Sequence, residues 1–184
     1  MYLNYGHFFI RYGIQCDAYK NVVKVDLSSN NLNGFIPSEI GELKAIKKLV
    51  LTTNSLNGYL PNQLSKLERI ENLDLSSNNL QGSIPSYFRF LKYLKELDLS
   101  SNVFTNTLPL DLFMLQDMES INLSNNSFSG ELASQLSNFT KLQSFNVSNN
   151  LLQGNVATLK DLRKLSKFCE IFSHLESNDL CRTG

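Results

Sequence analysis

The sequence lacks three things that many functional classes require: a long apolar run, a net charge and a set of histidines. No stretch approaches the roughly 18 consecutive apolar residues of a membrane-spanning helix, so direct membrane insertion is not expected. Lysine plus arginine and aspartate plus glutamate number 17 each among the 184 residues. A neutral chain lacks the basic footprint that attracts duplex nucleic acid or an anionic membrane surface, so nucleic acid is not expected as a partner.

The sequence also shows no catalytic constellation of side chains. His7 and His174 are the only histidines and lie near opposite ends of the sequence, where they cannot easily join a Ser–His–Asp or Cys–His site. No Walker motif or protein-kinase signature is present. Cys169, His174 and Cys181 lack the fourth ligand of a closed zinc site. We therefore expect no enzymatic activity, no cofactor and no resident metal.

What the sequence does contain is a 24-residue period. Alternating apolar pairs recur with this spacing, at Val25–Leu27, Leu49–Leu51, Leu73–Leu75, Leu97–Leu99, Ile121–Leu123 and Phe145–Val147. An asparagine follows each pair by three residues, at Asn30, Asn54, Asn78, Asn102, Asn126 and Asn150. The period predicts six stacked units over residues 22–157, between an N-terminal cap (1–21) and a C-terminal cap (158–184). Such stacks share one continuous core and present a long surface to partners.

Each unit predicts one short strand followed by an irregular return path. The apolar and polar residues around Leu73–Leu75 alternate with the period of a strand that has one buried face. Apolar residues in the return path recur at about every third position, which suits 3₁₀ or extended segments better than a long helix. Six such strands in register form a parallel sheet on the order of 25 Å wide, at about 4.8 Å per strand.

Asparagine, glycine and proline each recur at a fixed position of the repeat and so form three columns. The asparagines can satisfy buried backbone donors and acceptors in the turn after each strand. A glycine column predicts positive φ, at Gly34, Gly58, Gly82, Gly130 and Gly154, with Asn106 in the fourth repeat. A proline column, at Pro37, Pro61, Pro85 and Pro109, marks a GxIP segment that is expected to pair on the flank of the stack.

These motifs resemble one known family. VDLSSNNLNGFIPSEIGEL from Val25 and LDLSSNNLQGSIP from Leu73 are similar to plant-type leucine-rich repeats, found in the ectodomains of receptor-like kinases and in polygalacturonase-inhibiting proteins. The resemblance implies an α/β repeat solenoid: a right-handed curved stack with a parallel sheet on the concave face and a 3₁₀ or irregular convex side. RYGIQCD from Arg11 and NDLC from Asn178 resemble the family's two cap motifs in shortened or divergent form.

The resemblance implies a non-enzymatic, extracellular module that recognises a protein or peptide, of the receptor or co-receptor type. Two alternatives are an inhibitor of a pectin-degrading enzyme and an intracellular scaffold. The first residues lack the basic start and apolar run of a secretory signal, so an extracellular protein would need a signal upstream of this sequence. The oligomeric state is left open.

Cysteines and glycosylation motifs bear on the compartment. We favour a disulfide between Cys169 and Cys181, which would leave Cys16 free; the alternative is that Cys16 and Cys181 have each lost a partner. N-x-[ST] motifs occur at Asn122, Asn125, Asn138 and Asn146. Asn138 is the best acceptor because its segment lies on the return path, whereas glycans at Asn122 and Asn146 would block the strand face.

The outward positions of the strands form the predicted binding surface. Basic residues gather in the first two repeats and acidic residues follow, so that a partner could be oriented by charge. The expected contacts are Lys24, Lys47, Lys48, Val50, Glu71, Asp74, Lys95 and Asp98. Val50 is expected to be an exposed apolar contact within a column of polar residues. A second candidate surface is an apolar patch of Phe90, Phe113 and Met114 on the convex side.

Overall fold

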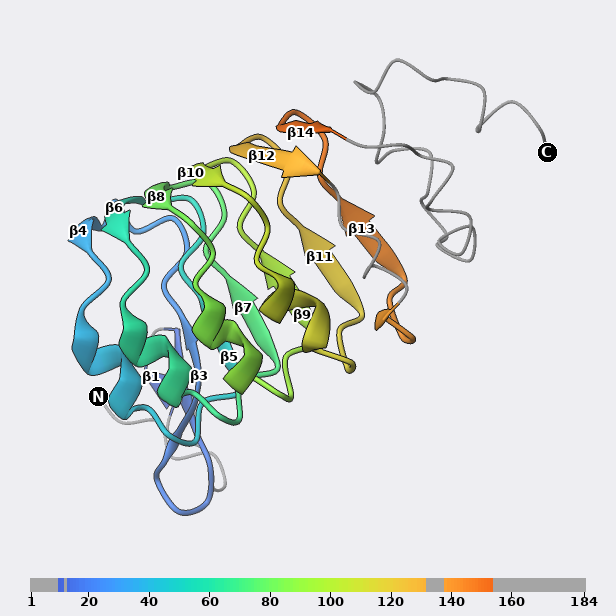
Figure 1. Cartoon of the computed structure of the whole chain (residues 1–184). Coiled ribbons are helices and arrows are strands. Elements are labelled where there is room, and N and C mark those ends of the chain that lie inside the picture. Colours follow the sequence, from blue (N-terminus) through green and yellow to red (C-terminus); the bar gives the residue numbers. More distant parts are fainter. Residues whose placement is uncertain (1–9, 12, 132–137, 154–184) are drawn as a thin grey trace.

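A computed structural model describes residues 10–11, 13–131 and 138–153. The predicted C-terminal cap (158–184) therefore lies outside the described residues, as do Cys169, Cys181 and Gly154, whereas about half of the predicted N-terminal cap (1–21) is described. The described residues form a single stack of coils in which each repeat makes one turn (Figure 1). They contain strands and 3₁₀ helices but no α-helix, as the spacing of the return path predicts.

The main sheet contains one strand from each repeat. It has the order β1-β2-β3-β5-β7-β9-β11-β13. Residues exactly one period apart pair in the parallel part, as in Leu49 with Leu73 and Leu73 with Leu97. Its strands are β1 (Ile10–Arg11), β2 (Ile14–Cys16), β3 (Val22–Asp26), β5 (Lys48–Val50), β7 (Asn72–Asp74), β9 (Glu96–Asp98), β11 (Ser120–Asn122) and β13 (Ser144–Asn146). The first two are antiparallel and extend the sheet at its N-terminal end.

A second parallel sheet runs along the upper edge of the stack in Figure 1, in the order β14-β12-β10-β8-β6-β4. Its strands are β4 (Asn33–Phe35), β6 (Ser55–Tyr59), β8 (Asn79–Gly82), β10 (Val103–Asn106), β12 (Ser127–Glu131) and β14 (Leu151–Gln153). The flanking pairing predicted for the GxIP segments is therefore present, but every strand ends before its proline. Proline has no N–H to donate to a sheet.

Each proline instead precedes a short 3₁₀ helix, with φ between −67° and −74°. These helices are η1 (Ser38–Glu42), η2 (Asn62–Lys66), η3 (Ser86–Phe90) and η4 (Leu110–Met114). They lie in a row on the side of the coil away from the main sheet (Figure 1). The fixed φ of proline suits this N-cap position, because the residue before the helix need not donate a hydrogen bond.

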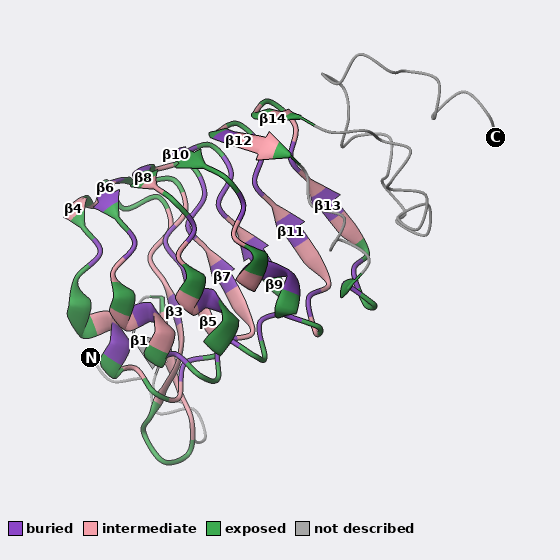
Figure 2. Cartoon of the chain, in the orientation of Figure 1, coloured by how far each residue is buried: buried purple, intermediate pink, exposed green. Residues whose placement is uncertain are grey.

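The core runs between the two sides of the coil without interruption. Buried segments recur at the same point of every turn (Figure 2). The rings of Phe104 and Phe128 stack with centroids 5.9 Å apart and planes 7° from parallel. The inward column of the main sheet is at most 6% exposed and consists of Val25, Leu49, Leu73, Leu97, Ile121 and Phe145. Because each repeat covers the next, burial depends on the stack rather than on any single unit.

The asparagine column ties each repeat to the one before it. Nδ2 of Asn78 donates to the carbonyl oxygens of Leu51, Leu75 and Ser76, and its Oδ1 accepts from the N–H of Leu56. The same four bonds recur for Asn54, Asn102, Asn126 and Asn150. Nδ2 of Asn30, in the first repeat, donates to Ser28 of its own turn.

The glycine column has the predicted backbone conformation at every described position. Its φ values lie between 79° and 94° at Gly34, Gly58, Gly82 and Gly130. Asn106, which replaces glycine in the fourth repeat, has a φ of 69°. Asparagine tolerates this region better than most residues with a Cβ, so the exception has a physical reason.

Candidate functional site

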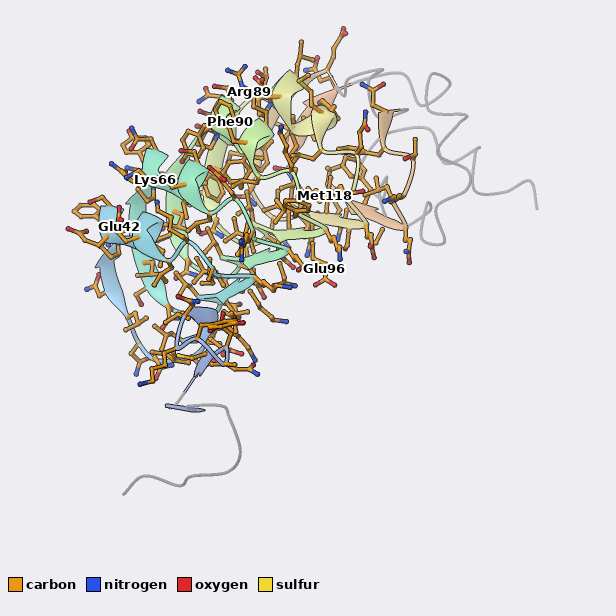
Figure 3. All side chains as sticks on the ribbon, turned by 90° about the horizontal axis from the view of Figure 1, so that it is seen from below. Glu42, Lys66, Arg89, Phe90, Glu96 and Met118 are labelled. Atoms are coloured by element: carbon orange, nitrogen blue, oxygen red, sulfur yellow. The ribbon has the colours of Figure 1, made fainter. Side chains whose placement is uncertain are left out.

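The outward side of the main sheet, which we call the strand face, carries two rows of side chains in register. One row consists of Lys48, Asn72, Glu96, Ser120 and Ser144 in adjacent strands, and Lys24 precedes it. The other row consists of Asp26, Val50, Asp74, Asp98, Asn122 and Asn146. Glu96 points away from the coil on the side opposite Arg89 and Phe90 (Figure 3). The strand face and the 3₁₀ side are thus separate surfaces.

Most polar side chains of the second row hydrogen-bond to the turn that follows their own strand. Oδ1 of Asp74 accepts from Oγ and from the backbone N–H of Ser76, and Asp98 holds Ser100 in the same way. The hydrogen bond from Ser28 to Asp26 lowers the pKa of that carboxyl. Asp74 and Asp98 are therefore half-buried turn-forming residues, and Oδ2 of Asp98 also accepts from Nδ2 of Asn122 at 3.0 Å.

Val50 is not exposed, contrary to expectation. It is only 7% exposed, although it lies outside the core cluster. Its neighbours in the row are Asp26 and Asp74, whose longer side chains flank a compact valine. Thr52 compensates for the missing carboxylate by a hydrogen bond of 2.7 Å to Oγ of Ser76 in the next repeat. Val50 is thus a packing residue with little exposed surface.

Three predicted contacts form one ion-pair network beside the first row. Glu71 accepts from Lys95 at 3.0 Å and lies 3.2 Å from the ammonium of Lys47. The hydrogen bond from Lys95, followed by that from Lys47, lowers the pKa of Glu71. The hydrogen bond between Lys95 and Glu71 also raises the pKa of Lys95. Lys47 therefore carries a charge that is already paired, and Lys24 is similarly 3.3 Å from Asp26.

The first row leaves polar groups available. Lys48 is half-buried, and Glu96 is exposed two strands away. Asn72 lies between them and donates Nδ2 to Glu96, while its Oδ1 is buried and has no hydrogen-bond partner among the described atoms. Ser120 and Ser144 continue the row with hydroxyl groups. The row thus presents an ammonium group at one end, a carboxylate near its middle and hydroxyl groups beyond.

Comparisons with known proteins agree with this architecture. The leucine-rich repeat model matches residues 20–80, and a second leucine-rich repeat model matches residues 93–115 and 117–139. The ectodomain of the receptor kinase SOBIR1 from Arabidopsis thaliana is 33% identical, with 78% of this chain and 83% of that chain covered and a TM-score of 0.73. The chain belongs to the plant-type leucine-rich repeat family.

Two further structures show how widely this similarity extends. The Arabidopsis thaliana BIR3–SERK2 complex contains a chain that is 31% identical, with coverage of 78% and 77% and a TM-score of 0.71. The Arabidopsis ectodomain of HAESA, in complex with an extended IDA peptide hormone, is 37% identical with a TM-score of 0.78. There the match covers 84% of this chain but 27% of HAESA. No curated protein matches this leucine-rich repeat chain.

The predicted apolar patch on the 3₁₀ side is partly wrong. Phe113 is fully buried, because its ring packs against Phe139 of the next repeat with centroids 5.6 Å apart. Phe90 and Met114 are exposed, at 47% and 65%. The guanidinium of Arg89 lies 4.9 Å from the centroid of the Phe90 ring and pairs with Asp111. The two exposed side chains therefore form a smaller patch, interrupted by charge.

The four glycosylation motifs differ in accessibility. Asn138 is exposed in the return path. Asn125 is also exposed, but its Oδ1 accepts from Asn149 and its φ is 54°. Asn122 and Asn146 are half-buried on the strand face, where each accepts from a serine two residues later. Asn138 remains the predicted acceptor.

The described residues contain no group of three or more side chains suited to hold a metal. No helix within them is long and apolar enough to cross a membrane. Cys16, at the end of β2, is half-buried and is not in a disulfide among these residues. The predicted pairing of Cys169 with Cys181 lies outside them.

Proposed function

We propose that the chain is a non-enzymatic recognition module whose strand face binds an extended segment of a secreted peptide or protein. The single observation that carries this proposal is the first row, in which Lys48, Asn72 and Glu96 stand in register on three adjacent strands. A five-strand row spans about 19 Å, at about 4.8 Å per strand, which matches about six residues of extended chain at about 3.3 Å each.

The charges in the row define the chemistry of the ligand. Lys48 favours an acidic side chain or a terminal carboxylate, and Glu96 favours a basic side chain or an amino group. These two residues are two strands apart, about 9.6 Å. This distance matches residues i and i+3 of a peptide in the polyproline II conformation, because three residues at about 3.1 Å each make one turn and bring both side chains to the same face. The expected ligand therefore has an acidic and a basic residue at positions i and i+3.

Internal pairing prepares the strand face for binding. Glu71 holds Lys47 and Lys95, and the aspartates of the second row hold their turn serines. Side chains that are already ordered lose little conformational entropy when a ligand binds. The network thus supports the first row without itself being expected to provide the main contacts.

The family relationship supports the same proposal. HAESA was solved with a peptide hormone, and the BIR3–SERK2 structure joins two proteins. Both belong to the class of plant receptor ectodomains with which this chain shares its repeats. An extracellular location and a receptor-like or co-receptor-like role follow from this relationship as part of the proposal.

Selection of displayed random peptides on the purified chain tests the proposal. Enriched peptides should carry the acidic and basic residues at the stated spacing. Lys48→Glu should weaken their binding at least tenfold, or about 1.4 kcal/mol. Lys66→Glu is the matched control, because Lys66 lies on η2, away from Glu96 (Figure 3). Selected peptides that bind the Lys48 variant as well as the wild type would contradict the proposed site.

A further inference from the structure

Two exposed aromatic rings lie on the second sheet, on a different surface from the strand face. Phe35 on β4 is 74% exposed and Tyr59 on β6 is 69% exposed. These two strands lie at the N-terminal end of the upper edge in Figure 1, and their tips are coloured as exposed in Figure 2. Phe35 and Tyr59 are equivalent positions one period apart. The sheet pairs Phe35 with Asn57 and Tyr59 with Gln81, so that the two aromatic residues are offset by one strand and by two residues along it.

Each ring rests on a glycine of the following strand. A Cβ at Gly58 would lie 2.4 Å from Cδ1 of Phe35, and a Cβ at Gly82 would lie 2.5 Å from Cδ1 of Tyr59. Both glycines have positive φ, at 79° and 87°. The rings therefore lie over backbone, which positions them in a fixed step-like arrangement while most of their surface remains in water.

Packing alone does not require aromatic residues here. In the fourth repeat Thr107 occupies the equivalent position, and a Cβ at Gly130 would lie 2.7 Å from its Cγ2. A small side chain thus covers the glycine equally well. In the third repeat Ser83 occupies the position equivalent to the two rings. The glycine that a ring there would cover is replaced in the next repeat by Asn106, whose side chain takes up that space. The stepped rings end at this point for a steric reason.

The position before the first ring is open. No described atom lies within 4 Å of a Cβ at Gly34. Gly34 is the equivalent of the two glycines that the rings cover, and it lies on β4, the last strand of the described sheet. A ring-shaped group of a ligand could therefore occupy this third step.

The surroundings of the rings are polar but uncharged. The outward side chains of β4, β6 and β8 include Asn33, Asn57 and Gln81, and none of the residues in these strands is ionisable except the phenol of Tyr59. Nδ2 of Asn57 donates to Oδ1 of Asn33 at 3.3 Å. Amide groups offer both donors and acceptors beside the apolar ring faces. We call Asn33, Phe35, Asn57, Tyr59 and Gln81 the aromatic strip.

We propose that the aromatic strip binds a neutral carbohydrate chain built of pyranose units. The apolar face of a pyranose can cover an aromatic ring, while its in-plane hydroxyl groups can bond to the amides. The lack of charge favours a neutral ligand over an acidic polysaccharide.

The size of the strip argues against a protein as the occupant. A stable protein interface usually buries about 800 Å² on each partner. On β4, β6 and β8 the only large apolar side chains that the structure shows as exposed are the two rings. A carbohydrate chain needs only the ring faces and the adjacent amides.

Titration with cellohexaose, monitored by the aromatic and amide NMR signals of the protein, tests the proposal. Signals of Phe35, Tyr59 and Asn57 should shift together. Phe35→Ala with Tyr59→Ala should weaken binding at least tenfold. Leu110→Ala with Met114→Ala is the matched control, because both side chains are exposed on η4 and lie outside the strip. This control and the Tyr59→Phe variant should bind as the wild type does.

Three results would overturn the proposal. They are the absence of shifts at millimolar cellohexaose, unchanged affinity of the double variant, and equal binding of a charged hexagalacturonate. A wild type that sediments as a dimer and a double variant that sediments as a monomer would instead identify a second copy as the occupant. A melting curve of the double variant, expected to be unchanged, separates loss of binding from loss of fold. The peptide proposal is independent, because it concerns the other sheet.

Discussion

Asn78 offers the sharpest test of how the repeats hold together. Its replacement by leucine removes four hydrogen bonds, three of them to the carbonyl oxygens of Leu51, Leu75 and Ser76. Each of these oxygens keeps another donor, since Asn54, Asn102 and the N–H of Thr53 also bond to them. The N–H of Leu56, by contrast, loses Oδ1 of Asn78 as its acceptor.

The magnitude follows from this difference. A buried donor without a partner costs about 1–3 kcal/mol, whereas the net loss of a bond to a group that keeps a second partner costs about 0.5 kcal/mol or more. With one such donor and three such bonds, Asn78→Leu should lower the free energy of unfolding by about 2.5–4.5 kcal/mol. Denaturant unfolding followed by circular dichroism measures this change directly.

Asn30→Leu is the matched control. Asn30 has the same residue type in the same column, but it is exposed and its Nδ2 bonds to Ser28 within its own turn. Its replacement should cost less than about 1 kcal/mol. Equal losses for the two variants, or no loss for Asn78→Leu, would refute the idea that the column stabilises the contacts between repeats.

Three further predictions concern stability and processing. Glu71→Gln should lower the free energy of unfolding by less than about 1 kcal/mol at pH 7; because the pKa of Glu71 is lowered in the fold, the difference from wild type should vanish in melting experiments as the pH falls below about 4. Val50→Ala should cost about 1 kcal/mol because Val50 is buried, whereas Val103→Ala, at a 44% exposed valine, should change stability by less than about 0.5 kcal/mol in the same assay. If the protein is secreted, peptide mapping should find a glycan at Asn138 and a disulfide between Cys169 and Cys181; unmodified Asn138 and three free thiols would contradict an extracellular location.

The repeat spacing was sufficient to predict the register of the main sheet. Because the period is constant, residues 24 positions apart must occupy the same place in successive coils, and Leu49 indeed pairs with Leu73. The glycine column predicted positive φ for a similar reason, since only a residue without a Cβ adopts it at little cost. The register and the positive φ could both be predicted because each depends on a short sequence pattern that recurs in every repeat.

Exposure could not be predicted in the same way. Alternation shows which face of a strand a side chain is on, but not whether its neighbours cover it. Val50 is outward and still buried between Asp26 and Asp74. Phe113 is buried because Phe139, from the next repeat, provides a partner ring. The pairing of Lys47 with Glu71 likewise depends on the geometry between strands.

One backbone feature had no signal in the sequence. The residue before each column asparagine has a φ between 53° and 56°; these residues are Ser29, Thr53, Ser77, Ser101, Asn125 and Asn149. Serine and β-branched threonine rarely adopt this region. The turn imposes it, because the N–H of Ser77 must reach the carbonyl oxygen of Ser100 at 2.9 Å. A propensity scale cannot reveal a conformation that the stack enforces.

A charge-swap titration tests the central claim, that an extended ligand lies along Lys48, Asn72 and Glu96. The measurement compares a peptide selected on the wild type with a second peptide in which its acidic and basic residues are exchanged. The wild type should bind the first peptide at least tenfold more tightly, and Lys48→Glu with Glu96→Lys should reverse this preference. A double variant that still prefers the first peptide would show that the ligand binds elsewhere.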